Sequence, residues 1–145
     1  MEQPDRARGA RALRDLTVLL TRVSPRAGLS RTAAGTLGRL AAQGPTRITD
    51  LAVQESASQP AMTGLVKRLE AAGHVVREAD PDDGRATRIA LTPSGRQALD
   101  ERRAAVDAAL RDLIDRLSPD HQSSLLAAVP AIEELVQITE DHAHA

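Results

Sequence analysis

The sequence predicts a mainly α-helical protein that carries one small β-hairpin, an α+β fold. Apolar residues recur at spacings of three and four along most of the 145 residues, whereas the alternation typical of strands is confined to residues 74–92. Glycines, prolines and capping serines or threonines divide the helical pattern into separate segments. The length suits a single domain, residues 1–145, with one core.

The composition excludes several kinds of site. Phe, Tyr, Trp and Cys are absent, which rules out aromatic stacking on bases, aromatic cation cages, disulfides, thiol redox sensing and cysteine-containing zinc sites. Residues 1–15 lack the apolar run of a signal peptide, and no stretch of about 18 apolar residues occurs. We expect a soluble, cytoplasmic protein with no membrane partner.

The net charge of −1 gives no sign of a nucleic-acid partner, but its distribution is uneven. Residues 1–40 hold eight arginines and three acids, whereas residues 100–145 hold four arginines and ten acids. Solvated helix faces are the commoner explanation of such a pattern. The acidic C-terminal part is expected to repel polyanions.

The first helix is predicted over residues 10–24 and ends at Pro25 and Gly28. Its apolar residues form one stripe: Leu13, Leu16, Leu20 and Val23. The second helix follows a capping Ser30 and stops at Gly44-Pro45. Small residues on it allow another helix to approach closely: Ala34, Gly35 and Gly38.

The third helix, within TRITDLAVQESAS, is short. Thr49 is its expected N-cap, and Asp50 lies in its first turn. Leu51 and Ala52 are its expected buried pair.

The fourth helix starts after a capping Ser58, tolerates Pro60 in its first turn and ends at Gly73. Its predicted apolar face consists of Met62, Leu65, Leu69 and Ala72. The opposite face has a ladder without acids: Gln59, Thr63 and Lys67. A helix-turn-helix needs such polar groups on the second helix, which enters the major groove, although an ordinary surface helix has the same pattern.

Strands are predicted in HVVREA, residues 74–79, and RATRIALT, residues 85–92. In the second strand, Thr87, Ile89 and Leu91 share one face, and Arg88 and Ala90 share the other. A helix-turn-helix followed by a hairpin is a winged helix, which we expect over residues 30–95.

The C-terminal part predicts two long helices. Thr92 or Ser94 caps one over about residues 95–117, and Ser118-Pro119-Asp120 starts the other. The apolar stripe of the first is Leu99, Val106, Leu110, Leu113 and Leu117. That of the second is Leu125, Val129, Ile132, Leu135 or Val136, and Ile138 or Thr139.

A small winged helix cannot cover stripes of this length. Together with the first helix they are expected to pack against a second subunit, because a long apolar seam would otherwise face water. We therefore expect dimerisation helices at residues 5–24 and 95–141, and a homodimer.

The segment DPDDGRATRIALT permits two kinds of site. Its aspartates could bind a cation, or its arginines could be the functional groups, supported by the aspartates. An EF-hand-like loop starting at Asp80 would require a ligand at position 84, a glycine at position 85 and a glutamate at position 91. The sequence has Gly84, Arg85 and Leu91, so none of the three requirements is met. Pro81 and Gly84 are instead expected to form a hairpin tip from which Arg85 projects.

No other motif indicates catalysis or a cofactor. The histidines, His74, His121, His142 and His144, include an H-x-H pair, but such a pair near a chain end is more often a tail than a zinc site. Neither a nucleophile elbow nor a glycine-rich phosphate loop occurs. We expect no metal, no cofactor and no enzymatic activity.

The segments TDLAV, SQPAMTGLVKRLEAAGHVVR and DPDDGRATRIALTPSG, in this order and spacing, resemble the MarR-type winged-helix transcriptional regulators. The resemblance covers nearly the whole chain. It implies a homodimer with interlocked N- and C-terminal helices that binds a pseudo-palindromic site on double-stranded DNA. Many members are repressors released by small anionic or phenolic ligands. One departure is the turn Glu55-Ser56-Ala57, where the family often has glycine; a positive φ there would strain Ser56.

The resemblance implies contacts to DNA from Ser58, Gln59, Pro60, Thr63, Lys67 and Arg85. Asp83 is expected to brace the wing by holding Arg85 or a neighbouring arginine. Arg14 and Arg22 are candidate partners of an anionic effector. The alternative function is a winged-helix module that binds another protein and has lost contact with DNA.

Overall fold

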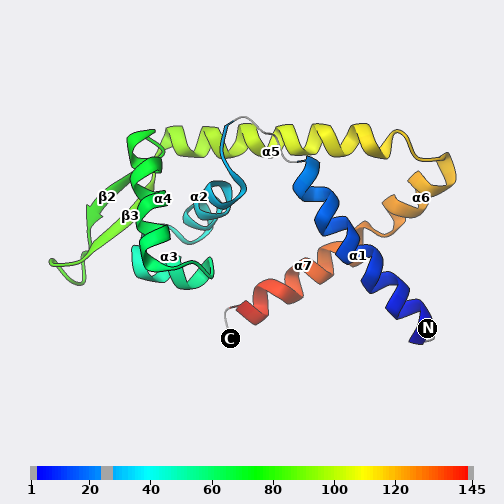
Figure 1. Ribbon diagram of the computed structural model, residues 1–145, viewed down its shortest axis with the longest axis horizontal. Helices are drawn as coiled ribbons and strands as arrows, with labels where there is room; N and C mark the ends of the chain where they lie inside the picture. Colours follow the sequence, from blue (N-terminus) through cyan, green and yellow to red (C-terminus); the bar gives the residue numbers. More distant parts are fainter. Residues whose placement is uncertain (1–2, 24–27, 144–145) are drawn as a thin grey trace. The chain divides into compact units, whose positions relative to one another are not determined.

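The computed structural model describes residues 3–23 and 28–143, with side chains for residues 5–23 and 28–138. The chain divides into two compact units, Met1–Val106 and Asp107–Ala145. In chain order the elements are α1 (Gln3–Val23), α2 (Arg31–Gln43), β1 (Thr46–Arg47), α3 (Ile48–Gln54), α4 (Gln59–Ala71), β2 (Val75–Ala79), β3 (Thr87–Leu91), α5 (Pro93–Ile114), α6 (Pro119–Ala127) and α7 (Val129–Ala143) (Figure 1).

The predicted first helix is confirmed as α1, which begins earlier than expected, at Gln3. Leu13, Leu16 and Leu20 on its stripe are exposed. The predicted stop at Pro25 lies outside the described residues. Gly28 has a φ of +86°, a conformation that glycine adopts without a steric penalty.

The second helix is capped at both ends as predicted. Ser30 Oγ accepts a hydrogen bond from Ala33 N–H at 3.1 Å, and Gly44 follows the helix with a φ of +82°. The third helix begins at Ile48, so the prediction of Thr49 as its N-cap was wrong. Arg47 takes that position without a side-chain cap, because the chain enters α3 directly from strand β1.

The fourth helix also matches its predicted start. Ser58 Oγ accepts a hydrogen bond from Ala61 N–H at 3.3 Å, and Pro60 lies in the first turn. Its buried face differs from the predicted one: Val66 is buried as well, and Ala72, at the C-cap, is exposed. Gly73 has a φ of +75° and reverses the chain into the hairpin.

The hairpin is antiparallel, with Val75 opposite Leu91 and Ala79 opposite Thr87. Strand β1 pairs with the other edge of β3, which gives the sheet order β1-β3-β2. The sequence analysis did not predict β1, because two residues are too few to show an alternating pattern. With this hairpin after α3 and α4, the predicted winged helix is confirmed.

One apolar core holds the winged helix together. Its buried residues come from α2, α3, α4, the sheet and the start of α5: Ala33, Leu37, Leu40, Leu51, Ala52, Met62, Leu65, Val66, Leu69, Val75, Ile89 and Leu99. Leu51 and Ala52 are buried as predicted. The core fixes α4 and the hairpin relative to one another and leaves the opposite face of α4 to solvent.

Thr92 caps α5, which decides between the two predicted caps. Its Oγ1 accepts from Gly95 N–H at 3.0 Å and donates to the carbonyl of Gly73 at 2.6 Å. Gly95 lies against the chain at His74, where an added Cβ would meet the carbonyl oxygen at 2.1 Å. A glycine is therefore required at this position.

The C-terminal unit corrects two predictions. Helix α5 ends at Ile114, and the predicted last helix is two helices, α6 and α7. Pro130 is the second residue of α7; it has no N–H, and its ring conflicts with the carbonyl of the preceding helical turn, which explains the interruption at this point. Ser118 caps α6. Within the described residues, no helix has the length and apolar character needed to cross a bilayer.

Candidate nucleic-acid interface

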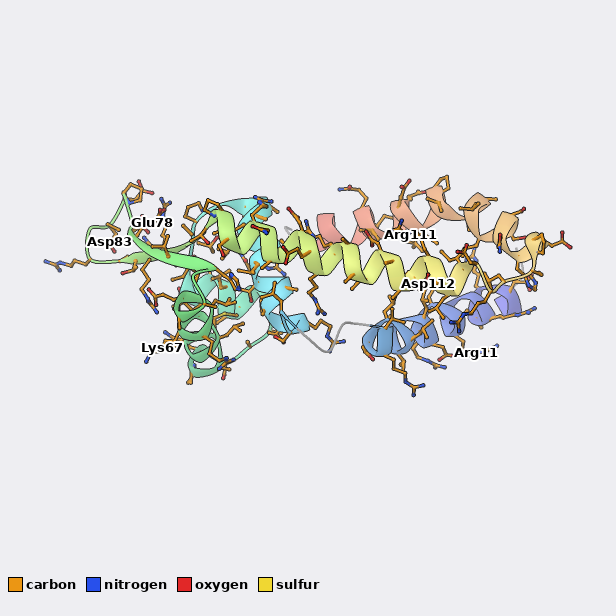
Figure 2. The ribbon with its side chains drawn as sticks, turned by 90° about the horizontal axis from the view of Figure 1, so that it is seen from above. Arg11, Lys67, Glu78, Asp83, Arg111 and Asp112 are labelled. Carbon is orange, nitrogen blue, oxygen red and sulfur yellow. The ribbon has the colours of Figure 1, made fainter. Side chains whose placement is uncertain are left out.

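The polar ladder of α4 faces solvent. Gln59 and Lys67 are exposed and Thr63 is half-buried, whereas Met62 and Val66 on the opposite face are fully buried. Figure 2 shows Lys67 extending from α4. Ser58 and Pro60 are exposed at the start of the helix. This surface presents hydrogen-bond donors and acceptors at the N-terminal end of the helix, the position from which helix-turn-helix proteins read base edges.

The turn before α4 adopts the strained conformation considered from the sequence. Ser56 has a φ of +50°, a region that residues with a Cβ rarely occupy. The adjacent Glu55 accepts a hydrogen bond from Arg39 Nε at 2.8 Å, and Arg39 Nη2 donates to the carbonyl of Gln54 at 3.3 Å. This clamp, which the sequence analysis missed, ties the turn to α2.

The tip of the wing is held by its own backbone. Asp80 N–H donates to the carbonyl of Ala86 at 3.0 Å, and Ala86 N–H donates to the carbonyl of Asp83 at 2.8 Å. Asp83 Oδ1 accepts from the backbone N–H of Arg85 at 3.1 Å. Asp83, labelled at the tip in Figure 2, thus holds the backbone of Arg85, whereas the prediction had it hold an arginine side chain. Gly84 does not have a positive φ.

The carboxylate that binds an arginine side chain is Asp80. It is 4% exposed, and its Oδ2 accepts from Arg47 Nε at 2.6 Å. Its Oδ1 accepts from Asp82 N–H at 3.0 Å. These contacts, first the backbone hydrogen bond and then Arg47, lower the pKa of Asp80, and Asp80 in turn raises the pKa of Arg47. From the sequence, Asp80 was considered as the first residue of a cation loop that the motif does not support.

The histidines do not form a site in the described part of the chain. No group of three or more His, Cys, Asp or Glu side chains comes together there. His144 and the side chain of His142 lie outside that part. His74 instead lies at the start of the hairpin, and its Nδ1 is buried without a hydrogen-bond partner among the described residues.

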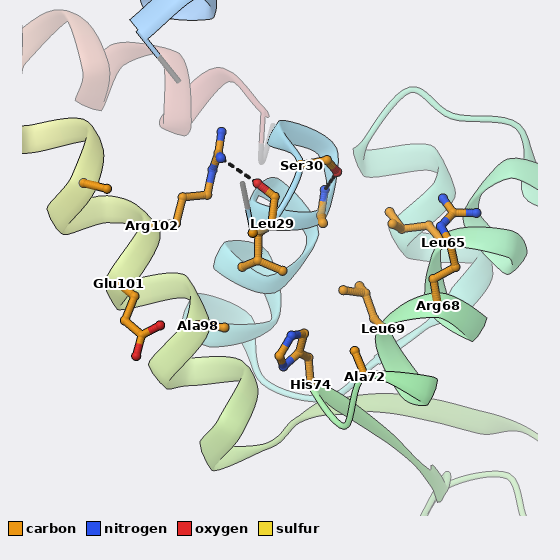
Figure 3. A pocket seen from close by; sticks show the side chains of 13 residues that line it. Leu29, Ser30, Leu65, Arg68, Leu69, Ala72, His74, Ala98, Glu101 and Arg102 are labelled. Carbon is orange, nitrogen blue, oxygen red and sulfur yellow. Dashed lines mark hydrogen bonds between the residues drawn. The ribbon is translucent and has the colours of Figure 1, made fainter. Parts of the chain in front are cut away.

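A hollow of 640 Å³ lies between the start of α2, the end of α4 and α5. Its polar lining includes Arg68, His74, Glu101 and Arg102. Figure 3 shows Arg68 and Arg102 on opposite sides of the hollow with His74 between them in this view. Arg102 Nη1 donates to the carbonyl of Leu29 at 2.5 Å.

The predicted effector residues do not line this hollow. Arg14 pairs with its neighbour Asp15 at 3.1 Å on the surface of α1, and Arg22 is exposed on the same helix. No periodic or motif signal in the sequence indicates the hollow, because its lining comes from three separated segments.

Comparison with known proteins identifies this arrangement. Residues 27–86 match the MarR family. Over 98 residues the chain is 34% identical to the HTH-type transcriptional regulator FarR of Neisseria gonorrhoeae, covering 66% of this chain and 67% of FarR. The chain belongs to the MarR family.

Two further comparisons agree with membership of the MarR family. The uncharacterized HTH-type transcriptional regulator YdgG of Bacillus subtilis is 33% identical over 100 residues, which are 68% of this chain and 66% of YdgG. The chain thus matches about two thirds of the length of these relatives. The transcriptional regulator Tm0710 from Thermotoga maritima has the same fold, with a TM-score of 0.76 at 23% identity over 97% of this chain and 99% of its own.

This MarR-family protein is a transcriptional regulator, and its winged helix positions the residues that the sequence analysis had selected. The core places the ladder of α4 on the outside and leaves Arg85 exposed at the tip of the wing. The supporting pairs Arg39–Glu55 and Arg47–Asp80 join residues far apart in the sequence. No local pattern could have indicated these pairs.

Proposed function

We propose that this MarR-family regulator is a repressor that binds a pseudo-palindromic operator as a homodimer. In each subunit, α4 enters the major groove and the wing reaches the adjacent minor groove. The observation that carries this proposal is the polar ladder of α4, in which Gln59 and Lys67 are exposed and Thr63 is half-buried, on a helix whose apolar face is buried in the core. A side chain in such a ladder can reach base edges without losing any packing in the core.

The chemistry of each residue suggests a role. Gln59 and Thr63 offer donors and acceptors suited to base edges. Lys67, further along the helix, is suited to a phosphate. Ser58 and Pro60 hold the helix start close to the backbone of the DNA. Arg85 extends from the wing, and a guanidinium is favoured in a narrow, A·T-rich minor groove because of its negative potential.

Exposed apolar side chains support the homodimer. On α1 they include Leu13, Leu16 and Leu19, and in the C-terminal unit they include Leu126, Val129 and Ile132. Such side chains rarely gather on the surface of a monomer without an interaction partner. We therefore propose that the helices within residues 5–24 and 95–141 form the dimer interface, apart from the start of α5, where Leu99 is buried in the core of the winged helix.

The hollow lined by Arg68 and Arg102 is the proposed effector site. Two guanidinium groups and a histidine suit a small anion, and the aliphatic lining suits an apolar ring. Since the chain contains no Phe, Tyr or Trp, the ring of a phenolic ligand could stack only on a guanidinium group or on the imidazole of His74. Arg14 and Arg22 remain candidates only if the second subunit brings α1 to the same place.

A gel shift with the intergenic DNA beside the gene tests the central proposal. The parent should shift this fragment, and Arg85→Ala should bind it at least tenfold more weakly, a loss of about 1.4 kcal/mol or more. Arg31→Ala, which removes an exposed arginine of α2 outside the proposed interfaces, is the matched control and should bind like the parent. If no intergenic fragment shifts while the folded protein captures a protein partner, the interaction-module alternative is correct.

Sedimentation of the protein at low micromolar concentration tests the dimer. A single dimeric species is expected, with unfolding that depends on protein concentration. A stable monomer with full helical content would contradict the proposed interface.

A further inference from the structure

The base of the wing contains an ion pair that connects it to the helix-turn-helix. Arg47 and Asp80 are 33 residues apart, and their Nε and Oδ2 atoms are 2.6 Å apart. Arg47 is the last residue of β1 and the N-cap position of α3. Its backbone is opposite Arg88 of β3. Asp80 follows β2 directly.

Asp80 is the last buried residue before the tip. The next five residues, 81–85, are all exposed. The hydrogen bonds that hold the tip join residues within the segment from Asp80 to Ala86. The direction in which this segment leaves the sheet therefore depends strongly on how Asp80 is held.

Each carboxylate oxygen of Asp80 accepts a hydrogen bond, and the two donors belong to different parts of the chain. One accepts the N–H of Asp82 and fixes the first turn of the tip, while the other accepts Arg47 from the helix-turn-helix. A charge-assisted hydrogen bond of this length is stronger than a neutral one. The charge of Arg88 also lowers the pKa of Asp80. The guanidinium of Arg88, however, pairs with the carboxylate of Glu78 at 3.6 Å.

We infer that Asp80 and Arg47 are positioning residues that set the direction of the wing tip, and thus of Arg85, relative to α4. This inference rests on the proposed contact of Arg85 with DNA. The effect of Asp80 on the position of Arg85 can be distinguished from the effect of its charge, because the two change DNA binding in opposite directions. Removing a negative charge near DNA should by itself tighten binding, whereas losing the position of Arg85 should weaken it.

The test is a mutant cycle on operator binding. Asp80→Asn should weaken binding roughly fivefold or more in the parent background, and have little effect in the Arg85→Ala background, because the two residues act as one unit. The loss should be larger for an operator with A·T pairs under the wing than for one with G·C pairs. Asp82→Asn is the matched control, because it removes the same charge from the same loop; it should bind as tightly as the parent or slightly more tightly.

A second measurement does not involve DNA. In the free protein, Asp80→Asn should raise the hydrogen-exchange rates of the Arg85 and Ala86 amides, and Asp82→Asn should not. If Asp80→Asn unfolds the protein, Arg47→Lys takes its place, since it keeps the charge but loses the Nε contact. Unchanged binding and unchanged exchange would overturn the inference. An Arg85→Ala variant that binds like the parent would instead overturn the proposed DNA contact of the wing, while the exchange rates would still decide how Asp80 holds the tip.

Discussion

Arg39 Nε lies 2.8 Å from Glu55 Oε1, and this contact fastens α2 to the turn that precedes α4. Both side chains are partly buried, with 30% and 15% of their surfaces exposed. Gly35 makes room for the carboxylate, since a Cβ at that position would lie 3.2 Å from Glu55 Oε2. The next residue, Ser56, has a φ of +50°. A strained residue persists only where its surroundings hold it, and the clamp provides that hold.

Loss of the clamp should destabilise the fold. Glu55→Ala is expected to lower the free energy of unfolding by about 1–2 kcal/mol, because it removes a charge-assisted hydrogen bond at a partly buried site. Chemical denaturation of Glu55→Ala, Arg39→Ala and the double variant measures the coupling. Asp100→Asn, which breaks an exposed pair at 3.7 Å, is the control and should change stability little. Strictly additive losses would show that the two residues do not act together.

Relief of the strain should stabilise the protein. Ser56→Gly is expected to raise the free energy of unfolding by up to about 1 kcal/mol, since the left-handed region costs a residue with a Cβ about 1–2 kcal/mol and glycine gives back part of the gain as chain entropy. Ser56→Ala retains the Cβ and should give no such gain. Thermal unfolding of the two variants decides the matter. Equal melting temperatures would mean that the turn is not strained.

Gly95 should tolerate no side chain. Gly95→Ala places a Cβ 2.1 Å from the carbonyl oxygen of His74, so the start of α5 must move away from the hairpin. We expect a loss of about 2 kcal/mol or more in unfolding free energy, as for other overpacked sites. Gly84→Ala is the control, because it meets nothing within 4 Å and has no positive φ. A Gly95→Ala protein as stable as Gly84→Ala would contradict the close packing at this point.

The three ladder residues of α4 should have different roles. Gln59 and Thr63 should read the base sequence, and Lys67 should bind the phosphate backbone. Gln59→Ala and Thr63→Ala should each cost about 1–3 kcal/mol on the operator and less on random DNA. Lys67→Ala should weaken binding to all sequences alike and reduce the salt dependence. Binding isotherms on both DNAs at several salt concentrations separate these outcomes. If the ratio of operator to random affinity stays unchanged in Gln59→Ala and Thr63→Ala, neither residue reads the sequence.

Acid should remove the contribution of Asp80. Its pKa is lowered in the folded protein, so its stabilisation is present above the unfolded value of about 3.9 and is lost as the pH falls through the lower folded value. The difference in unfolding free energy between the parent and Asp80→Asn should therefore be constant near neutral pH and shrink as the pH falls below about 4. Denaturant titrations between about pH 7 and 2.5 measure it. A difference that stays constant on acidification would show that the charge of Asp80 contributes nothing.

The sequence by itself determined the features that depend on neighbouring residues. Ser30 and Ser58 cap their helices because a side-chain oxygen reaches an N–H three residues later. Leu51 and the apolar face of α4 are buried because helical spacing places them on one side. The positive φ at Ser56 was also accessible from the motif of the turn. Pro130 marked the break between α6 and α7, although the sequence analysis did not use it.

Only the tertiary structure decided which distant residues meet. The pairing of β1 with β3 places the N-cap of α3 at Arg47 where the sequence predicted Thr49, and it brings Arg47 to the base of the wing. Among three aspartates in one turn, Asp80 is the buried one because Arg47 lies opposite it, and the local sequence gives no reason to prefer it over Asp83. The lining of the hollow comes from three segments that the core brings together. Caps and periodicity follow from the geometry of a single helix or strand, whereas these contacts exist only after separate elements have packed.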